Sequence, residues 1–192
     1  MRDWGRMTTA HPHPSALDGP VAIVGDGRMG RALAAAVPTA RGPFGRGFRG
    51  EGFDVVILAV PDAAIGSAAA AIAPGRMVGH CAGAIGLDVL APHEAFGVHP
   101  LMTVTLDGAT FEGAGAAIAG TTTRALALAR RLAESLGMQA FEIADSDRAA
   151  YHAAASIASN FLVVLEDAAE QLMRTAGADR SMLAPLVRAA ME

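Results

Sequence analysis

Short runs of apolar residues alternate with helix-forming segments through most of the chain. The apolar runs predict strands over Val21–Val24, Asp54–Val60, Met77–His80, Phe96–His99, Ala116–Ala119 and Gln139–Ile143. The segments between them predict helices over Met29–Val37, Ala63–Ile72 and Thr123–Leu136. Strands that alternate with helices are typical of right-handed crossover connections and of a parallel sheet covered on both faces. We therefore predict an α/β fold with a doubly wound, mostly parallel sheet.

Three stretches depart from this alternation. Residues 1–19 lack the apolar segment that a signal peptide requires, and we predict a loose leader there. Residues 39–52 are rich in Gly, Pro and Arg and show no clear period. From residue 147 the pattern becomes helical, with a break at Gly177. The predicted division is a leader over residues 1–19, an α/β domain over residues 20–146 and a helical unit over residues 147–192.

The strongest chemical signal follows the first predicted strand, where a GxGxxG pattern opens a helix. In this setting the first glycine permits a tight turn, the second lets a pyrophosphate approach the backbone, and the third lets the helix pack on the strand. The free N–H groups of the helix N-terminus also favour phosphates. A glycine turn that binds no ligand is the alternative. The motif predicts a Rossmann-like dinucleotide site formed by Gly25, Asp26, Gly27, Arg28, Met29 and Gly30.

The choice between NAD and NADP depends on the end of the second strand, where an acidic residue holds the ribose hydroxyls of NAD. The corresponding region contains Arg41, Arg46 and Arg49, and its only acid is Glu51. Guanidinium groups match a 2′-phosphate in a bidentate way. We therefore expect NADP to be favoured over NAD, with Arg41 and Arg46 as its partners. A solvated arginine loop would have the same composition.

Two histidines end predicted strands on the side where open α/β sheets bind their ligands. His80 and His99 are each candidates for a catalytic acid or for a structural hydrogen-bonding group. Cys81 is expected to be a packing residue, because no basic neighbour favours its thiolate. These three residues have no local ligand spacing that supports a metal site, and we predict none.

A polar stripe interrupts the alanine-rich helical segment YHAAASIASN, which spans Tyr151–Asn160. His152, Ser156 and Asn160 fall near one face of the predicted helix. Polar groups on an apolar helix need partners, which a packed core or a bound substrate can supply. The pattern leaves both alternatives open.

Composition removes several kinds of chemistry. The chain has 192 residues, a formal charge of -4 and 52% hydrophobic residues, which argues against disorder and against nucleic-acid binding. All 15 basic residues are arginine, so no lysine can form a Schiff base or donate a proton. The single cysteine indicates a reducing compartment, which we take to be the cytoplasm. The apolar stretches over residues 55–73 and 149–165 do not have the composition of membrane spans.

Five segments carry a family resemblance, because GDGRMG, LAVPD, HCAG, HPLMT and YHAAASIASN follow one another in this order. Together they resemble an uncharacterised Rossmann-like family whose NADP-binding domain precedes a helical carboxyl-terminal domain of unknown function. This family is related to pyrroline-5-carboxylate reductase, prephenate dehydrogenase and the β-hydroxyacid dehydrogenases. The resemblance begins at Pro20. Family members continue past the position of Glu192, so we expect the helical unit to be truncated.

The resemblance implies roles for residues outside the glycine motif. The loop Ala59, Val60 and Pro61 would line the dinucleotide, and His80, Cys81 and Gly83 would lie beside its nicotinamide. The substrate cleft would be faced by His99, Tyr151, His152 and Asn160. Two departures bear on these roles. Relatives commonly have a serine at the position of Ala82 and often a lysine near Arg148, and the second strand and its helix are compressed into residues 39–52.

These observations lead to two hypotheses of different kinds. The first is an NADP-dependent oxidoreductase that transfers hydride to or from a small keto, imino or hydroxy acid. Without lysine its proton donor must be histidine or tyrosine, and His99 and His152 are the favoured candidates, with Asn160 orienting the substrate. The second is a dinucleotide-binding module without turnover, acting as a sensor or a partner subunit. In either case the resemblance implies a homodimer formed through the carboxyl-terminal helices.

Overall fold

The computed structural model describes residues 19–105 and 108–190. The predicted leader therefore lies almost wholly outside the described residues. The chain divides into two compact units, the first ending at Arg148 and the second beginning at Ala149. This division falls two residues beyond the boundary expected from the sequence.

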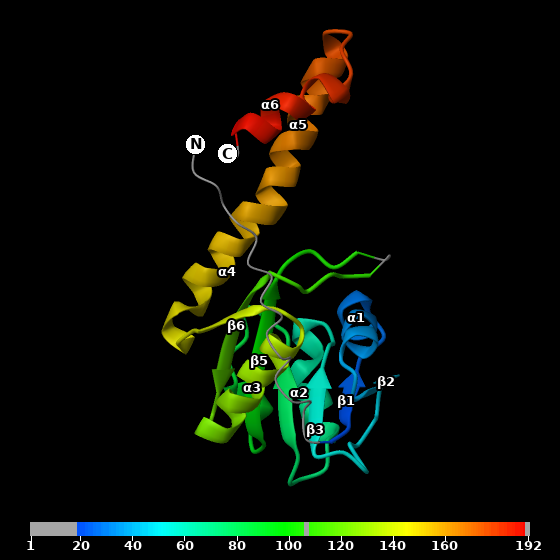
Figure 1. The fold of residues 1–192 in the computed structure, drawn as a ribbon, viewed down its shortest axis with the longest axis vertical. Helices are drawn as coiled ribbons and strands as arrows, with labels where there is room; N and C mark the ends of the chain where they lie inside the picture. Colours follow the sequence, from blue (N-terminus) through cyan, green and yellow to red (C-terminus); the bar gives the residue numbers. More distant parts are fainter. Residues whose placement is uncertain (1–18, 106–107, 191–192) are drawn as a thin grey trace, which may run out of the picture. The chain divides into compact units, whose positions relative to one another are not determined.

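The first unit is built on a seven-stranded sheet in the order β2-β1-β3-β4-β5-β6-β7 (Figure 1). The strands β1 to β5 are parallel to one another, and β6 and β7 run antiparallel to them. Their bounds are β1 (Val21–Val24), β2 (Ala40–Phe44), β3 (Val55–Leu58), β4 (Met77–His80), β5 (Glu94–Leu101), β6 (Gly115–Gly120) and β7 (Gln139–Glu142). The α/β class and the mostly parallel, doubly wound sheet predicted from the sequence are confirmed.

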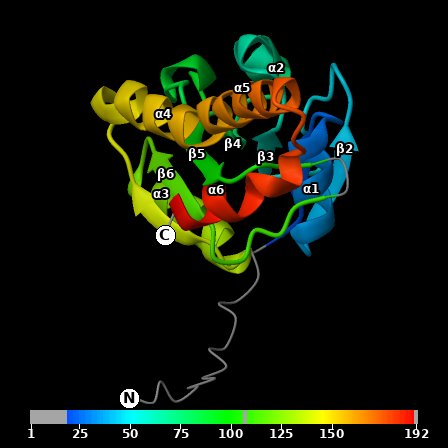
Figure 2. The same ribbon diagram turned by 90° about the horizontal axis from the view of Figure 1, so that it is seen from above.

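Helices cover both faces of this sheet, as Figure 2 shows from above. The helices α1 (Arg28–Ala36) and α3 (Thr123–Ser135) bury small apolar side chains against one face. The helix α2 (Ile65–Ala71), which follows a 3-10 turn at Asp62–Ala64, packs on the other face. The abundance of alanine allows this close approach, since Ala32, Ala69 and Ala129 are all buried. A core of small residues therefore holds the helices near the backbone of the sheet.

The segment without a clear period contains an edge strand. β2 pairs in parallel with β1, although its sequence ARGPF includes both glycine and proline. Proline is tolerated at an edge, because one side of such a strand has no ladder to complete. Among the described residues no helix lies between β2 and β3. Three rings pack together there instead, with the Phe44 and Phe48 centroids 4.0 Å apart and Phe53 meeting both edge-on.

The second unit is entirely helical in its described part. Its elements are α4 (Arg148–Ser156), whose first residue belongs to the first unit, a π-helical turn η4 (Ile157–Phe161), α5 (Leu162–Thr175), a 3-10 turn η5 (Arg180–Met182) and α6 (Ala184–Ala190). The break expected at Gly177 is present, and this glycine has φ +75. None of the residues from 149 to 190, all of which the structure describes, is buried. None of the described helices is long and apolar enough to cross a bilayer.

Candidate functional site

The candidate cofactor site lies where the strand order turns back. β1 has β2 on one side and β3 on the other, and the chain leaves β1 toward α1 on one face but leaves β3 toward α2 on the opposite face. Crevices at the carboxyl ends of strands at such a switch point are where open α/β sheets bind ligands. The residues that follow these two strand ends are Gly25 and Ala59, and the Ala59 N–H donates to the Val24 carbonyl over 2.8 Å. The glycine motif therefore lies beside the loop Ala59, Val60 and Pro61 at the carboxyl ends of β1 and β3, and the cofactor contacts of both stay predictions.

The three glycines of the motif differ in the space around them. At Gly25, where φ is +113, an added Cβ would collide with the Ala59 carbonyl. At Gly30 it would collide with the carbonyl of Gly25, because α1 approaches the turn so closely. At Gly27, by contrast, no atom lies within 4 Å of an added Cβ. The first and third glycines close the turn, and the second leaves open space beside the backbone.

That open space lies at the N-terminus of α1. Gly27 is the N-cap, with φ -79 and no side chain to accept from the first turn of the helix. The first four N–H groups of a helix have no partner within it, and the helix dipole adds partial positive charge there. A pyrophosphate fits this arrangement in both charge and available room.

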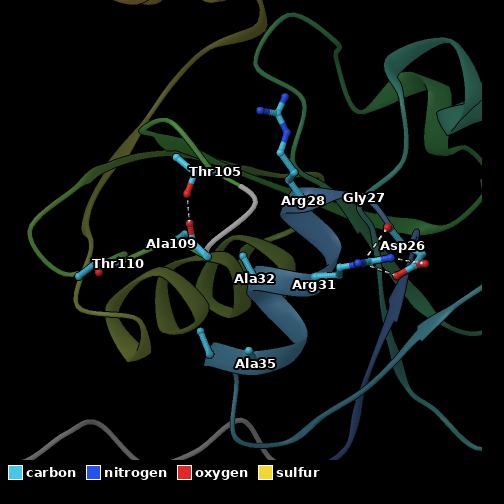
Figure 3. A pocket seen from close by; sticks show the side chains of 11 residues that line it. Asp26, Gly27, Arg28, Arg31, Ala32, Ala35, Thr105, Ala109 and Thr110 are labelled. Atoms are coloured by element: carbon cyan, nitrogen blue, oxygen red, sulfur yellow. Dashed lines mark hydrogen bonds and ion pairs between the residues drawn. The ribbon is translucent and has the colours of Figure 1, made fainter.

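A groove with a volume of about 940 Å³ extends from the motif along α1, and Figure 3 shows it from close by. Arg28 lies at the motif end of this groove, and Thr105 and Thr110 contribute from the connection between β5 and β6. The acid of the motif is neutralised, since Asp26 accepts two hydrogen bonds from Arg31, 2.8 and 2.9 Å long. These bonds lower the pKa of Asp26, so the carboxylate is held in its ionised, paired form. The charge of Arg28 remains available to an anionic ligand.

The arginines of residues 39–52 occupy three different settings. Arg41 lies within β2 and donates to the Ala40 carbonyl over 2.8 Å. Arg49 pairs with Glu51 at 3.3 Å. Arg46 is exposed and follows the carboxyl end of β2 by two residues, where a ribose-binding residue is expected. Of the three, Arg46 has the position that best suits a 2′-phosphate.

His80 ends β4 and is only 1% exposed. Its Nε2 lies 3.2 Å from the Gly86 carbonyl, and its Nδ1 accepts from the Ala82 N–H over 3.2 Å. A carbonyl can only accept and an N–H can only donate, so these partners require the neutral tautomer with hydrogen on Nε2. Burial is the main reason that the pKa of His80 is lowered. Both ring nitrogens thus hold the loop after β4, and His80 fits the structural alternative rather than that of a proton donor.

Cys81, the next residue in the chain, has an unreactive thiol. Burial raises its pKa to about 12, so the thiolate is not populated near neutral pH. Its sulfur packs against the larger apolar cluster, in agreement with the packing role expected from the sequence. Gly83 lies in the same loop, beyond the carboxyl end of β4. Within the described part of the chain no three His, Cys, Asp or Glu side chains are grouped to hold a metal ion.

His99 is placed near the carboxyl edge of the sheet by the length of β5. Gly97 pairs with His80, the last residue of β4, so β5 continues past the end of its neighbour. Successive side chains of a strand alternate between faces, so Gly97 and His99 share one face. The half-buried His99 side chain belongs to the face on which α2 packs, because Ala95 on the same face contacts the α2 cluster.

Sequence reasoning gave Arg148 no role, but the structure places it on that same face. Its side chain is 6% exposed, and its Nε donates to Asp145 Oδ1 over 2.6 Å. The Nη2 nitrogen is buried and has no hydrogen-bond partner. It lies 3.8 Å from the position of an added Cβ at Gly97. A buried donor without a partner costs about 1–3 kcal/mol, and more when the group is charged.

The remaining predicted residues belong to the second unit. Tyr151 and His152 lie on α4, while Asn160 lies within the π-helical turn η4. Tyr151 is half-buried, and His152 and Asn160 are exposed. Short π-helical turns occur frequently at functional sites. The roles of these three residues toward a substrate stay predictions.

The match to a known protein family covers the carboxyl-terminal part of the chain. Residues 114–192 match the family model described as "Domain of unknown function (DUF2520)". The predicted resemblance is confirmed. The DUF2520 match begins just before β6, so it includes the last part of the first unit as well as the helices. No curated protein matches the chain.

Several solved structures, each less than 25% identical in sequence, share the fold of this chain. A proposed NADP oxidoreductase from Bacteroides fragilis is 18% identical with a TM-score of 0.73, covering 89% of this chain and 78% of its own. A reductive aminase from Aspergillus terreus, in complex with NADPH and ethyl-5-oxohexanoate, is 16% identical with a TM-score of 0.71, covering 90% and 74%. The NADP-bound pyrroline carboxylate reductase of Plasmodium falciparum is 15% identical with a TM-score of 0.66, covering 92% and 77%.

Proposed function

We propose that this protein is an NADP-dependent oxidoreductase that transfers hydride to or from a small keto, imino or hydroxy acid. The observation that carries the proposal is the contrast among the motif glycines. Gly25 and Gly30 leave no room for a Cβ, whereas Gly27 leaves open space at the N-terminus of α1. This cradle fits a pyrophosphate. The fold shared with oxidoreductases that bind NADP or NADPH supports the same function.

The chain's own groups have distinct tasks in this proposal. NADPH, when bound, supplies the hydride. The α1 N-terminus and Arg28 hold its phosphates. His99 donates a proton from its imidazole to the substrate oxygen or nitrogen that becomes negative, since the chain contains no lysine for this step. Tyr151, His152 and Asn160 keep the roles that the family resemblance implies, with His152 as the second candidate donor and Asn160 as the residue that orients the substrate.

The preference for NADP is assigned to Arg46. Its position after β2 matches the place where dinucleotide-binding sheets contact the adenosine ribose. A guanidinium there attracts the 2′-phosphate of NADP and gains nothing from the free hydroxyl of NAD. Arg41 adds positive charge on the same edge strand.

We further propose that the protein is a cytoplasmic homodimer joined through its carboxyl-terminal helices. The helix α5 exposes Val163, Val164, Leu165 and Leu172 by 65% or more of each side chain. Leu165 and Leu172 are seven positions apart and share one face of this helix. An exposed apolar helix face supports an interaction site. A second copy of the chain would cover it in an isologous interface.

The decisive experiment is a titration of the protein with NADPH and NADH, followed by melting temperature and by quenching of intrinsic fluorescence. A ligand at 100 times its Kd stabilises the folded state by about 2.7 kcal/mol, so binding is easily seen. We expect stabilisation by both, and more at equal concentration by NADPH. A panel of 2-keto acids, cyclic imino acids and hydroxy acids then tests turnover through absorbance of the reduced nicotinamide. Binding without turnover of any compound would support the alternative, a dinucleotide-binding module; no shift with either nucleotide would contradict both.

A further inference from the structure

We propose that Arg148 binds the carboxylate of the substrate, and that the site therefore selects 2-oxo or 2-imino acids. This inference rests on the proposed function, because the substrate is bound beside the nicotinamide. It assigns a role to the buried guanidinium that the cofactor site leaves unused. Asp145 and Gly97 complete the group, which we call the Arg148 cluster.

The first argument is the incomplete hydrogen bonding of Arg148. Guanidinium groups present a rigid planar fork that matches a carboxylate in a bidentate way. Asp145 occupies the Nε side of this fork at 2.6 Å and fixes its orientation. Nη2 is left buried with no acceptor. A buried charged donor calls for an acceptor, and a substrate oxygen would supply one when it binds.

The second argument concerns charge. Arg148 has a side chain that is 6% exposed, whereas its partner Asp145 is 66% exposed. Water screens the carboxylate of Asp145 more effectively than it screens the buried guanidinium. His80, which lies near enough for Arg148 to affect its pKa, is neutral and contributes no competing charge. Asp62, the other acid that acts on His80, is exposed. Arg148 is therefore the least screened of these charges toward an entering anion.

The third argument is the location of the cluster. Gly97 faces the guanidinium without a side chain of its own, since a Cβ there would lie 3.4 Å from Leu87 and 3.8 Å from the Nη2 nitrogen, both ordinary contact distances. His99 lies two residues further along the same face of β5, which is about 7 Å toward the carboxyl edge. In a 2-oxo or 2-imino acid the reacting atom is bonded directly to the carboxylate carbon. A carboxylate on Arg148 would therefore direct the reacting carbonyl or imine toward His99.

The test uses the full-length protein with saturating NADPH and two isosteric probes, oxamate and the neutral oxamide. We expect oxamate to raise the melting temperature and oxamide to leave it unchanged. Arg148→Gln should weaken oxamate binding at least tenfold, and Arg148→Lys should restore it only in part, because a lysine lacks the fork. Arg131→Gln, which removes an exposed arginine of α3, serves as the matched control and should behave as the wild type.

Two results would overturn the inference. One is equal stabilisation of the wild type by oxamide and oxamate, or by neither; this comparison needs no variant and holds even if Arg148→Gln fails to fold. The other is a folded Arg148→Gln protein that binds oxamate as well as the wild type. The proposed function is judged separately by NADPH binding in the absence of either probe. Its failure is thus distinguishable from failure of the role assigned to the Arg148 cluster.

Discussion

The two units of the chain are stabilised in opposite ways. The first unit buries its apolar side chains in two clusters, one on each face of the sheet. In the second unit none of the described residues is buried, and apolar residues such as Leu172 and Leu186 are exposed by about two thirds or more. Both units are rich in alanine and leucine, so composition does not explain the contrast.

The difference lies in what the helices pack against. In the first unit α1, α2 and α3 each cover a sheet whose central strands are buried on both faces. The helices of the second unit have no sheet of their own. Helical stability in proteins derives mainly from tertiary packing of an apolar face. The first unit therefore contains its own core and the cofactor cradle, whereas the described part of the second unit contains no buried core of its own.

The largest loss of stability is expected from Gly30→Ala, which disrupts the packing of α1 in the first unit. The new Cβ would collide with the Gly25 carbonyl, a backbone atom that cannot move aside cheaply. Overpacking of this kind costs about 3 kcal/mol, which corresponds to a fall in melting temperature of roughly 10 °C. NADPH binding should be lost as well.

Gly27→Ala is the matched control for this change, because its Cβ would enter open space. We expect its melting temperature to stay close to that of the wild type, while NADPH binding weakens through loss of the pyrophosphate approach. If both variants lost the same stability, the contrast between the closing and the open glycines would be wrong.

The second effect separates the two units directly. Leu172→Glu places a charge on the exposed apolar face of α5, where Leu172 is 70% exposed. Burying an unpaired carboxylate between two copies is costly, so the dimer should dissociate. Sedimentation should then give the mass of a single chain. Because the cradle belongs to the first unit, NADPH affinity should not change.

Gln171→Glu is the control, since it adds the same charge at the neighbouring polar position of α5. It should leave the dimer intact. A wild-type protein that sediments as a monomer would contradict the proposed dimer, because the second unit would then be stable without a partner.

A smaller effect is expected at the edge of the first unit from Arg46→Gln. Loss of a charged hydrogen bond to the 2′-phosphate removes about 1.4 kcal/mol, which is a tenfold weaker affinity for NADPH. NADH affinity should be unchanged, because NAD has no phosphate at that position. Calorimetric titration of both nucleotides checks the result. Equal weakening of both would reassign Arg46 to a contact that the two share.

The smallest effect concerns pH and His80. The folded protein holds this ring neutral with a lowered pKa, whereas in the unfolded chain it titrates at its usual value of 6.5. The stabilisation is thus fully present above pH 6.5 and declines as the pH falls below that value, because the unfolded state binds the extra proton. Urea unfolding between pH 8 and 5 should show this decline. His80→Gln, which keeps a donor for the Gly86 carbonyl, should flatten it; an unaltered slope would contradict the assigned tautomer.

The elements that follow from local pattern were predictable. β1 and β4 have the bounds expected from their apolar runs, because a strand buried on both faces is apolar throughout. β2 could not be delimited in this way. Its five residues include Gly42 and Pro43, and its pairing with β1 is a tertiary interaction that overrides a weak local preference.

The candidate site divides in the same manner. The glycine motif lies within six consecutive residues, so its spacing alone predicts a phosphate-binding turn. Arg148 gave no such signal, because its burial depends on Gly97, 51 positions earlier in the sequence, and on the ion pair with Asp145. Because the chain has no lysine, the sequence favours histidine as the proton donor. The sequence does not distinguish His80 from His99 in this role. The hydrogen bonds of His80 show that its ring has a structural role, and His99 stays a candidate acid.

The proline of β2 has a consequence for how the protein behaves at high concentration. An edge strand offers unpaired backbone groups to which another sheet can add, and such addition leads to aggregation. Pro43 has no N–H to offer, and the neighbouring Arg41 places a charge on the exposed strand. These two residues discourage sheet-to-sheet pairing at this end of the molecule. An arginine- and proline-bearing edge thus protects the sheet from growing by addition of another copy.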